Sequence, residues 1–182
     1  IMFSGQKFTN ILNTTPSLKD RTVVLNGVSK AYSMTGWRIG YAAGPSDIIK
    51  AMTKIQSQST SNPSSISQAA AEAALTGDQS CVSTMCKAFE ERHAYIVEAL
   101  NDIDGVSCMS CDGTFYCFPN LQGLLDRTDE VSNDVEFAEH LLVKAGIAGV
   151  PGTAFGSPGH IRFSYATSME VLEQAMSRLR SL

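Results

Sequence analysis

Residues 26–40 read NGVSKAYSMTGWRIG and place a lysine and an arginine among small residues. Lys30 follows residues 22–26, which we expect to form a buried strand, and Arg38 comes eight positions later. Ligands of α/β domains bind at the carboxyl ends of strands. A desolvated lysine amine can attack a carbonyl there, and a planar guanidinium can hold a phosphate. A second interpretation stays open, in which both are solvated side chains around a sharp turn.

The residues around this segment alternate strand and helix patterns, which is typical of an α/β domain. Residues 38–43 form a second predicted strand, and a helix is expected from Pro45 or Ser46. An alanine-rich helix follows over residues 67–75. We therefore expect a first domain over residues 1–80.

A compact α+β domain is predicted over residues 81–182, beginning with a long amphipathic helix. Asp112-Gly113 predicts a turn between two short strands. Two later helices begin at Asn133 and Thr167, each with a glutamate three residues on, and the first of them ends at Gly146. The expected apolar positions are Met85, Phe89, Ile96, Ala99 and Leu100 in the long helix, Phe137, Leu141 and Leu142 in the next, and Leu172, Ala175, Met176 and Leu179 in the last. The expected strands are residues 106–109, 114–118, 147–150 and 160–165.

Composition narrows the classes of function. The chain has 182 residues, of which 43% are hydrophobic, and a net charge of -4 without a basic block, so we expect no nucleic-acid binding. Its apolar runs are far shorter than the about 20 residues of a membrane helix, so we expect no membrane association. No leader pattern precedes the first strand, and we expect a cytoplasmic protein. The chain begins without Met, as if cut from a longer one.

The cysteines indicate a reducing compartment, because their number is odd and no leader is visible. Cys108 and Cys111 form a C-x-x-C pair that is compatible with half of a zinc site, a redox pair or two ordinary thiols. No second close pair or nearby histidine completes four metal ligands, so we expect no metal site. The five cysteines are Cys81, Cys86, Cys108, Cys111 and Cys117.

The segment from Gly27 to Gly40 resembles the pyridoxal-phosphate attachment site of class I and II aminotransferases, the aspartate aminotransferase family of fold type I. The resemblance implies that Lys30 is the catalytic residue, which binds the cofactor covalently and later moves the substrate's α-proton. It implies that Arg38 holds the cofactor phosphate. Ser29, in the same loop, is implied as a further hydrogen-bond donor to that phosphate.

Further segments are similar to the same family. GTFY at residues 113–116 resembles a strand of its small domain, and HIRFSYA at residues 160–166 resembles its substrate strand. The resemblance implies that Arg162 pairs with the α-carboxylate of the substrate; the alternative is a surface arginine on an edge strand. Residues 55–63 resemble the family's loop that reaches across the interface of a homodimer.

The resemblance implies transfer of an amino group from an amino acid to a 2-oxo acid such as 2-oxoglutarate. Residues 39–91 contain no arginine, whereas the animal and enterobacterial members of the family read the second carboxylate of the substrate with an arginine in this region. Residues 58–68 look more like the prokaryote-type aspartate/prephenate subgroup, and this resemblance implies aspartate as donor, ahead of an aromatic or alanine-type donor. The chain is expected to hold the carboxyl-terminal part of the cofactor-binding large domain and the small domain, and to be inactive alone. The alternatives are an aminotransferase-like effector domain of a transcription regulator and a pyridoxal-phosphate lyase of the same fold.

Overall fold

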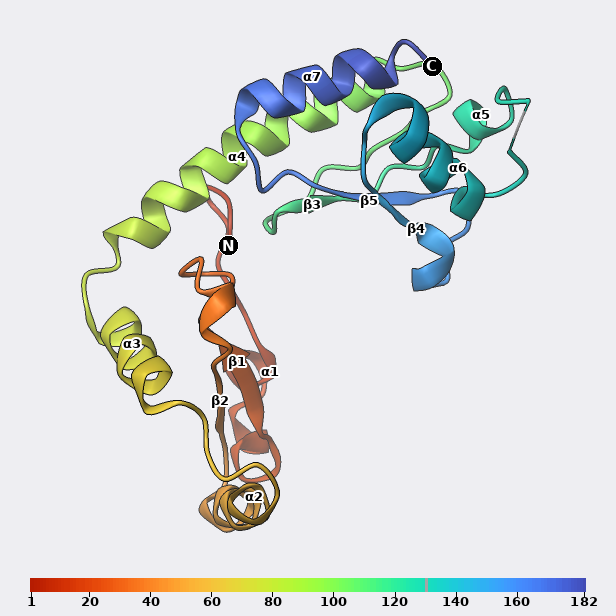
Figure 1. The fold of residues 1–182 in the computed structure, drawn as a ribbon. Helices are drawn as coiled ribbons and strands as arrows, with labels where there is room; N and C mark the ends of the chain where they lie inside the picture. Colours follow the sequence, from red (N-terminus) through yellow and green to blue (C-terminus); the bar gives the residue numbers. More distant parts are fainter. Residues whose placement is uncertain (130) are drawn as a thin grey trace. The chain divides into compact units, whose positions relative to one another are not determined.

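A computed structural model describes residues 1–129 and 131–182 of the chain. It divides into two compact units, each made of helices and a small sheet (Figure 1). The first unit comprises Ile1 and Lys7–Met85, and the second comprises Met2–Gln6 and Cys86–Leu182. This division falls inside a helix, and the domain boundary after residue 80 stays a prediction.

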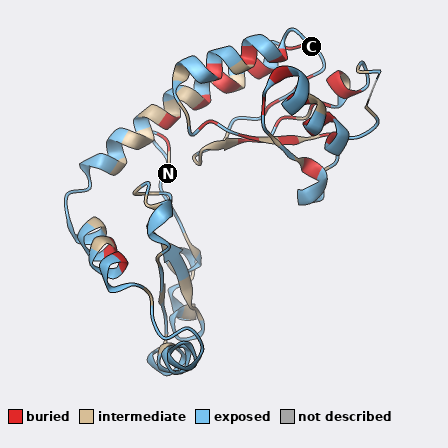
Figure 2. Cartoon of the chain, viewed as in Figure 1, coloured by how far each residue is buried: buried red, intermediate tan, exposed pale blue. Residues whose placement is uncertain are grey.

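The sheet of the first unit consists of β1 (Val24–Gly27) and β2 (Gly40–Ala43), paired antiparallel. Both strands were expected, but the prediction that the first one is buried is wrong. The side chain of Leu25 is 74% exposed, because the sheet has two strands and no further strand of the described residues adjoins it. Figure 2 shows that no residue of β1 is coloured as buried.

Helix α2 (Ser46–Ser59) of the first unit also leaves its apolar residues unburied. It begins after Pro45, as the sequence indicated, and buries none of its side chains. It continues through the first part of the polar segment that resembles an interface loop, so residues 55–59 are helical. Asn62-Pro63 lies beyond the helix, where a residue before proline disfavours helical backbone. The other helices are α1 (Ile11–Thr14), η1 (Pro16–Arg21), η2 (Thr35–Trp37) and α3 (Ser65–Thr76).

The long amphipathic helix is confirmed as α4 (Ser80–Asn101). Its buried face contains the predicted Phe89, Ile96, Ala99 and Leu100, spaced by one or two helical turns. His93 lies on the same buried face and was not expected there. Burial lowers the pKa of His93, although a hydrogen bond involving Cys111 acts in the opposite direction, so the neutral imidazole is favoured.

The sheet of the second unit has the order β3-β5-β4, with both pairs antiparallel. Its strands are β3 (Tyr116–Cys117), β4 (Val150–Pro151) and β5 (Ile161–Ser164). Of the predicted hairpin, the strand at residues 114–118 is present as β3, but residues 106–109 form no strand, because only Ser107 pairs there, with Asn120, as an isolated bridge. The backbone N–H and C=O of Cys108 are bound instead by the side chain of Asn101, 2.8 and 3.0 Å away, so this residue joins no ladder.

Two helices of the second unit begin where a side chain accepts hydrogen bonds from the first free N–H groups of the helix. Asn133 caps α6 (Asp134–His140) by accepting from the N–H groups of Val135 and Glu136, as its position predicted. The cap of α7 (Met169–Leu179) is Ser168 and not the predicted Thr167, because the Ser168 hydroxyl accepts from the third helical N–H. The remaining helices are α5 (Gln122–Leu125), the π-helical turn η3 (Leu141–Ala145) that ends at Gly146 with a positive φ, and η4 (Gly152–Phe155).

The core of the second unit forms where α4, α7 and the sheet bury their apolar faces (Figure 2). Leu142 lies outside this core although it was predicted inside, because the π-helical turn leaves it 55% exposed.

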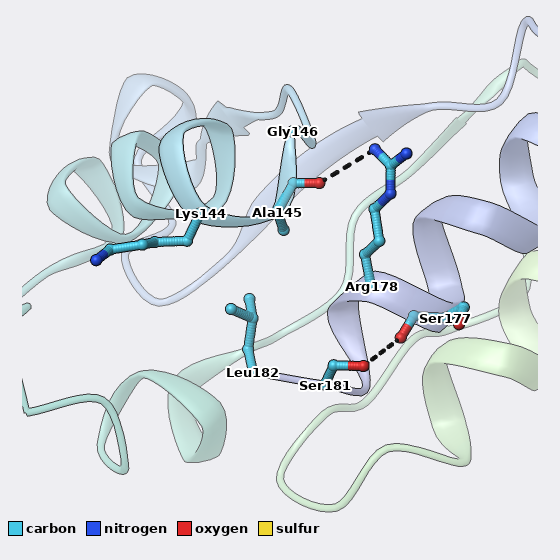
Figure 3. A pocket seen from close by; sticks show the side chains of 7 residues that line it. All are labelled: Lys144, Ala145, Gly146, Ser177, Arg178, Ser181 and Leu182. Atoms are coloured by element: carbon cyan, nitrogen blue, oxygen red, sulfur yellow. Dashed lines mark hydrogen bonds between the residues drawn. The ribbon is translucent and has the colours of Figure 1, made fainter.

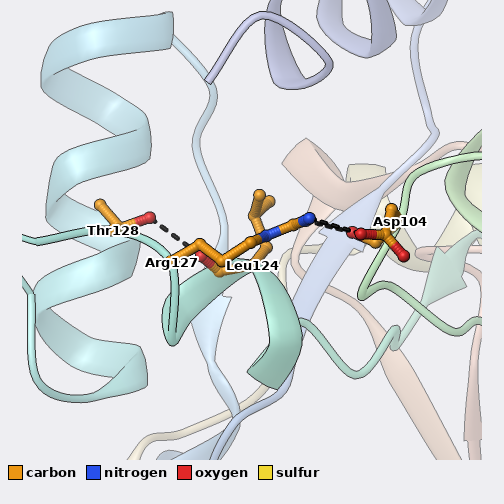
Figure 4. Close-up of polar contacts among 4 residues, drawn as sticks. All are labelled: Asp104, Leu124, Arg127 and Thr128. Carbon is orange, nitrogen blue, oxygen red and sulfur yellow. Dashed lines mark hydrogen bonds and ion pairs between the residues drawn. The ribbon is translucent and has the colours of Figure 1, made fainter.

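The surface of the second unit carries ion pairs such as Arg127 Nη1 with Asp104 Oδ2 at 2.6 Å beside α5 (Figure 4). Exposed ion pairs of this kind contribute at most about 1 kcal/mol to the free energy of unfolding. Within the described residues, none of the helices is long and apolar enough to cross a membrane. The largest fully buried side chains of this unit are Tyr165, Phe137, Ile96, Leu100, Leu121, Leu141, Ile161 and Leu179.

Candidate functional site

The loop that carries Lys30 and Arg38 spans residues 28–39 and is closed by β1 and β2. Gly27 lies opposite Gly40 where the two strands end and begin. A Cβ atom on Gly40 would lie 3.1 Å from the carbonyl oxygen of Asn26, which is closer than most such contacts. Glycine at this position therefore lets the two strands approach each other at the base of the loop.

The first half of the loop is a turn anchored by Val28, which is fully buried. The N–H of Tyr32 donates to the carbonyl of Val28 at 3.2 Å, and the N–H of Ser33 donates to the carbonyl of Lys30 at 3.2 Å. The phenol of Tyr32 donates to Gln79 Oε1 at 2.7 Å, which ties the turn to the residues before α4. The Lys30 side chain is exposed on this turn, and Ser29 beside it is half-buried.

The second half of the loop ends in a strained residue. Arg38 has left-handed backbone angles, φ 50° and ψ 50°, which a residue with a Cβ adopts at an energetic cost. Its Nη1 donates to the carbonyl of Thr35 at 3.0 Å, so the side chain folds back over η2. Such outliers cluster at functional sites, where the surrounding structure maintains them.

These residues form a donor set of defined chemistry. Lys30 offers an amine, Arg38 a planar fork of N–H donors and Ser29 a hydroxyl, all on one loop. An amine can bond covalently to an aldehyde, while a guanidinium and a hydroxyl suit a phosphate. The set therefore fits a phosphorylated aldehyde.

Arg162 belongs to the second unit, on the central strand β5. Burial alternates along this strand: Ile161 and Phe163 face the core, while Arg162 lies half-buried on the other face. The guanidinium carbon of Arg162 lies 4.4 Å from the ring centroid of Tyr116 and 4.6 Å from that of Phe155. The sequence did not single out these two rings, although Tyr116 lies in the quoted GTFY motif.

The C-x-x-C pair, Cys108 and Cys111, lies in the second unit. Among the described residues, no three His, Cys, Asp or Glu side chains are grouped to hold a metal ion. Cys111 Sγ donates to the carbonyl of Gly113 at 3.0 Å, and all five cysteines are free thiols. A hydrogen bond with Cys108, together with burial, raises the pKa of the Cys117 thiol and keeps it protonated. These contacts match ordinary thiols.

One cavity of the second unit lies away from Arg162. It has a volume of about 510 Å³ and is lined by residues of η3, α7 and the segment after it (Figure 3). Within it Arg178 Nη1 donates to the carbonyl of Ala145 at 3.4 Å, and the side chain of Lys144 points away from Arg178. Its cationic side chains therefore do not converge on one ligand position.

Comparison with known proteins gives one consistent family. The family described as "Aminotransferase class I and II" matches residues 1–179. The aspartate/prephenate aminotransferase of Nitrosomonas europaea is 54% identical over 187 residues, which cover 100% of this chain and 47% of the relative. The aspartate aminotransferase of Geobacillus stearothermophilus is 49% identical and is covered over 45% of its length. The chain thus spans about half the length of the curated relatives it matches.

Solved structures agree with this match. The crystal structure of the aspartate aminotransferase from Rhizobium meliloti has a TM-score of 0.92 and 45% identity, and the similarity covers 100% of this chain and 46% of that one. An aromatic aminotransferase from Pyrococcus horikoshii has a TM-score of 0.86 and 34% identity, with 99% of this chain and 47% of that one covered.

Proposed function

Because the chain belongs to the class I and II aminotransferases, we propose that it supplies the lysine and arginines with which a fold type I enzyme transfers an amino group from an amino acid to a 2-oxo acid. Pyridoxal phosphate is the cofactor of this family and, when bound, supplies the electron sink for chemistry at the substrate's Cα. The relatives are named aminotransferases, which favours neither a regulator's effector domain nor a lyase.

The observation that supports this function is the placement of Lys30 and Arg38 on one loop whose ends meet at Gly27 and Gly40. Lys30 binds the cofactor aldehyde and moves the substrate's α-proton. Arg38 binds the cofactor phosphate, and Ser29 donates a further hydrogen bond to it. The turn around Val28 and the left-handed backbone of Arg38 orient these groups before the cofactor arrives.

The amino donor in this proposal is aspartate and the acceptor is 2-oxoglutarate. Arg162 binds the α-carboxylate through the two parallel N–H groups of its guanidinium. Names of the relatives support the donor, since those of Nitrosomonas europaea and Geobacillus stearothermophilus are called aspartate/prephenate and aspartate aminotransferase.

The proposal also concerns the residues that lie outside this chain and the oligomeric state of the enzyme. Since relatives are about twice as long, we propose that residues outside this chain complete the cofactor site and that the chain is inactive alone. We place the enzyme in the cytoplasm as a homodimer. Five free thiols support a reducing compartment.

A chimera tests this function. The chain replaces the matching residues of the Nitrosomonas europaea relative, and formation of oxaloacetate from aspartate and 2-oxoglutarate is measured. We expect transamination by the chimera and none by the chain alone. The matched control is the chimera with Lys50→Ala, an exposed lysine on α2, which should keep the activity that Lys30→Ala removes. A folded chimera without transamination would overturn the proposal.

A further inference from the structure

We infer that Tyr116 and Phe155 are positioning residues that orient the guanidinium of Arg162 without occupying its hydrogen-bond donors. The inference rests on the proposed carboxylate-binding role of Arg162. Both rings lie beside the guanidinium, at 4.4 Å for Tyr116 and 4.6 Å for Phe155. These distances are well inside the about 6 Å limit of a cation–π contact.

The register of the sheet brings Tyr116 to Arg162. Tyr116 on β3 pairs with Ser164 on β5, and Arg162 lies two positions before Ser164. Side chains two residues apart on a strand share a face, so Tyr116 and Arg162 are diagonal neighbours across the two strands. The Tyr116 ring also packs on Phe115, with centroids 4.2 Å apart, which limits its movement.

A different framework holds Phe155. It ends η4, which follows β4 directly, and β4 pairs with β5 so that Val150 lies opposite Arg162. Asp134, only 2% exposed, accepts hydrogen bonds from Thr153 N–H at 2.7 Å and Thr153 Oγ1 at 2.6 Å. These bonds fix the start of η4 and therefore the position of the ring at its end.

Within the described part of the chain, the guanidinium of Arg162 forms no ion pair with a carboxylate. The arginines that do form ion pairs there are Arg127, with Asp104, and Arg180, with Asp102. A protein carboxylate beside Arg162 would compete with the substrate's carboxylate for the same N–H groups. Aromatic rings contact the flat face of a guanidinium and leave the N–H groups in its plane available. The rings thus reduce the rotamer entropy that Arg162 loses on binding a carboxylate.

The test uses the whole chain of 182 residues and maleate as a carboxylate probe, with no cofactor present. NMR follows the Nε–H resonance of Arg162, which ring currents shift in the wild-type protein, while maleate is added. Tyr116→Leu and Phe155→Leu should each move this resonance toward its unstacked value and raise the Kd for maleate about two- to fivefold, the loss expected for one exposed cation–π contact. Circular dichroism establishes that each variant is folded.

Two control variants make the result specific. Tyr116→Phe keeps the ring and should keep both the shift and the affinity. Phe118→Leu removes a neighbouring ring that contacts Phe155 and His160, with centroids 5.9 and 5.1 Å away, and should leave the Arg162 resonance close to its wild-type position. Wild-type affinity in folded Tyr116→Leu and Phe155→Leu proteins, when Arg162→Ala abolishes binding, would overturn the positioning role. Unchanged binding in Arg162→Ala would instead overturn the carboxylate role of Arg162 in the proposed function.

Discussion

Gly27 lies directly opposite Gly40 in the antiparallel pairing of β1 with β2, and this pair closes the loop that carries Lys30 and Arg38. The carbonyl oxygen of Asn26 would lie only 3.1 Å from a Cβ atom on Gly40. A side chain there must push the strands apart, and the ends of the loop would separate with them. The geometry of the proposed cofactor site therefore depends on the absence of a side chain at Gly40.

Replacing Gly40 by alanine should weaken cofactor binding in the chimera. The displaced strands cost about 1 kcal/mol, and we expect the Kd for pyridoxal phosphate to rise about fivefold, by equilibrium dialysis. Gly36→Ala is the matched control, because a Cβ atom at Gly36 meets no atom within 4 Å. Equal affinities in the two variants would contradict this role of Gly40.

Substitution of Arg38 should separate backbone strain from phosphate binding. Arg38→Gly relieves the left-handed strain of φ 50°, so this variant should be more stable than Arg38→Ala by about 1 kcal/mol in urea unfolding. Both variants lose the guanidinium. The ratio of the Kd for pyridoxal to the Kd for pyridoxal phosphate should therefore fall at least about tenfold in each of them. An intact preference in either variant would show that Arg38 does not bind the phosphate.

The stability of the second unit should depend on pH through Asp134. Burial raises the pKa of this carboxyl, but the hydrogen bonds from Thr153 outweigh it and hold the pKa below its ordinary value of about 3.9. The folded state then binds fewer protons, so the stabilisation is present above about pH 4 and is lost as the pH falls through the lower, folded-state pKa. Asp134→Asn should destabilise the protein at pH 7 by about 1–3 kcal/mol.

Urea unfolding at pH 7, 5 and 3 measures this dependence. The difference between wild type and Asp134→Asn should shrink at pH 3, while Asp129→Asn, an exposed carboxylate, should show little difference at any pH. A difference of the same size at pH 3 and pH 7 would contradict the linkage.

Thr114 is a second strained residue, with φ 85°, directly before the Phe115-Tyr116 pair. A β-branched side chain is disfavoured at positive φ, so Thr114→Gly should raise the free energy of unfolding by about 1 kcal/mol. Thr114→Ala keeps a Cβ atom in the same conformation and should bring no such gain. Thermal unfolding of both variants measures the effect, and equal melting temperatures would argue against strain at this position.

Local patterns explain which features the sequence could predict. The buried residues Phe89, Ile96 and Leu100 of α4 repeat at helical spacing, and the cap at Asn133 is made by hydrogen bonds to residues two and three positions later. Both features could be predicted because they depend on residues that are close in the sequence. The loop with Lys30 and Arg38 is likewise one continuous segment.

Apart from the shift of the α7 cap from Thr167 to Ser168, the main features that were missed depend on contacts between distant residues. Leu25 has the apolar character of a buried strand, but its exposure is decided by what covers the sheet. His93 is buried because Phe3, far away in the sequence, stacks on it with centroids 4.9 Å apart. The two rings beside Arg162 come from β3 and η4, and only the register of β5 with its neighbours brings them there.

The central claim is that Lys30 is the residue that binds the cofactor covalently. Its most direct test is borohydride reduction of the chimera loaded with pyridoxal phosphate, followed by peptide mass spectrometry. We expect one stoichiometric pyridoxyl label, on Lys30, which is absent from Lys30→Ala and unchanged in Lys50→Ala. A stoichiometric label on another lysine, or one that persists in Lys30→Ala, would contradict the claim.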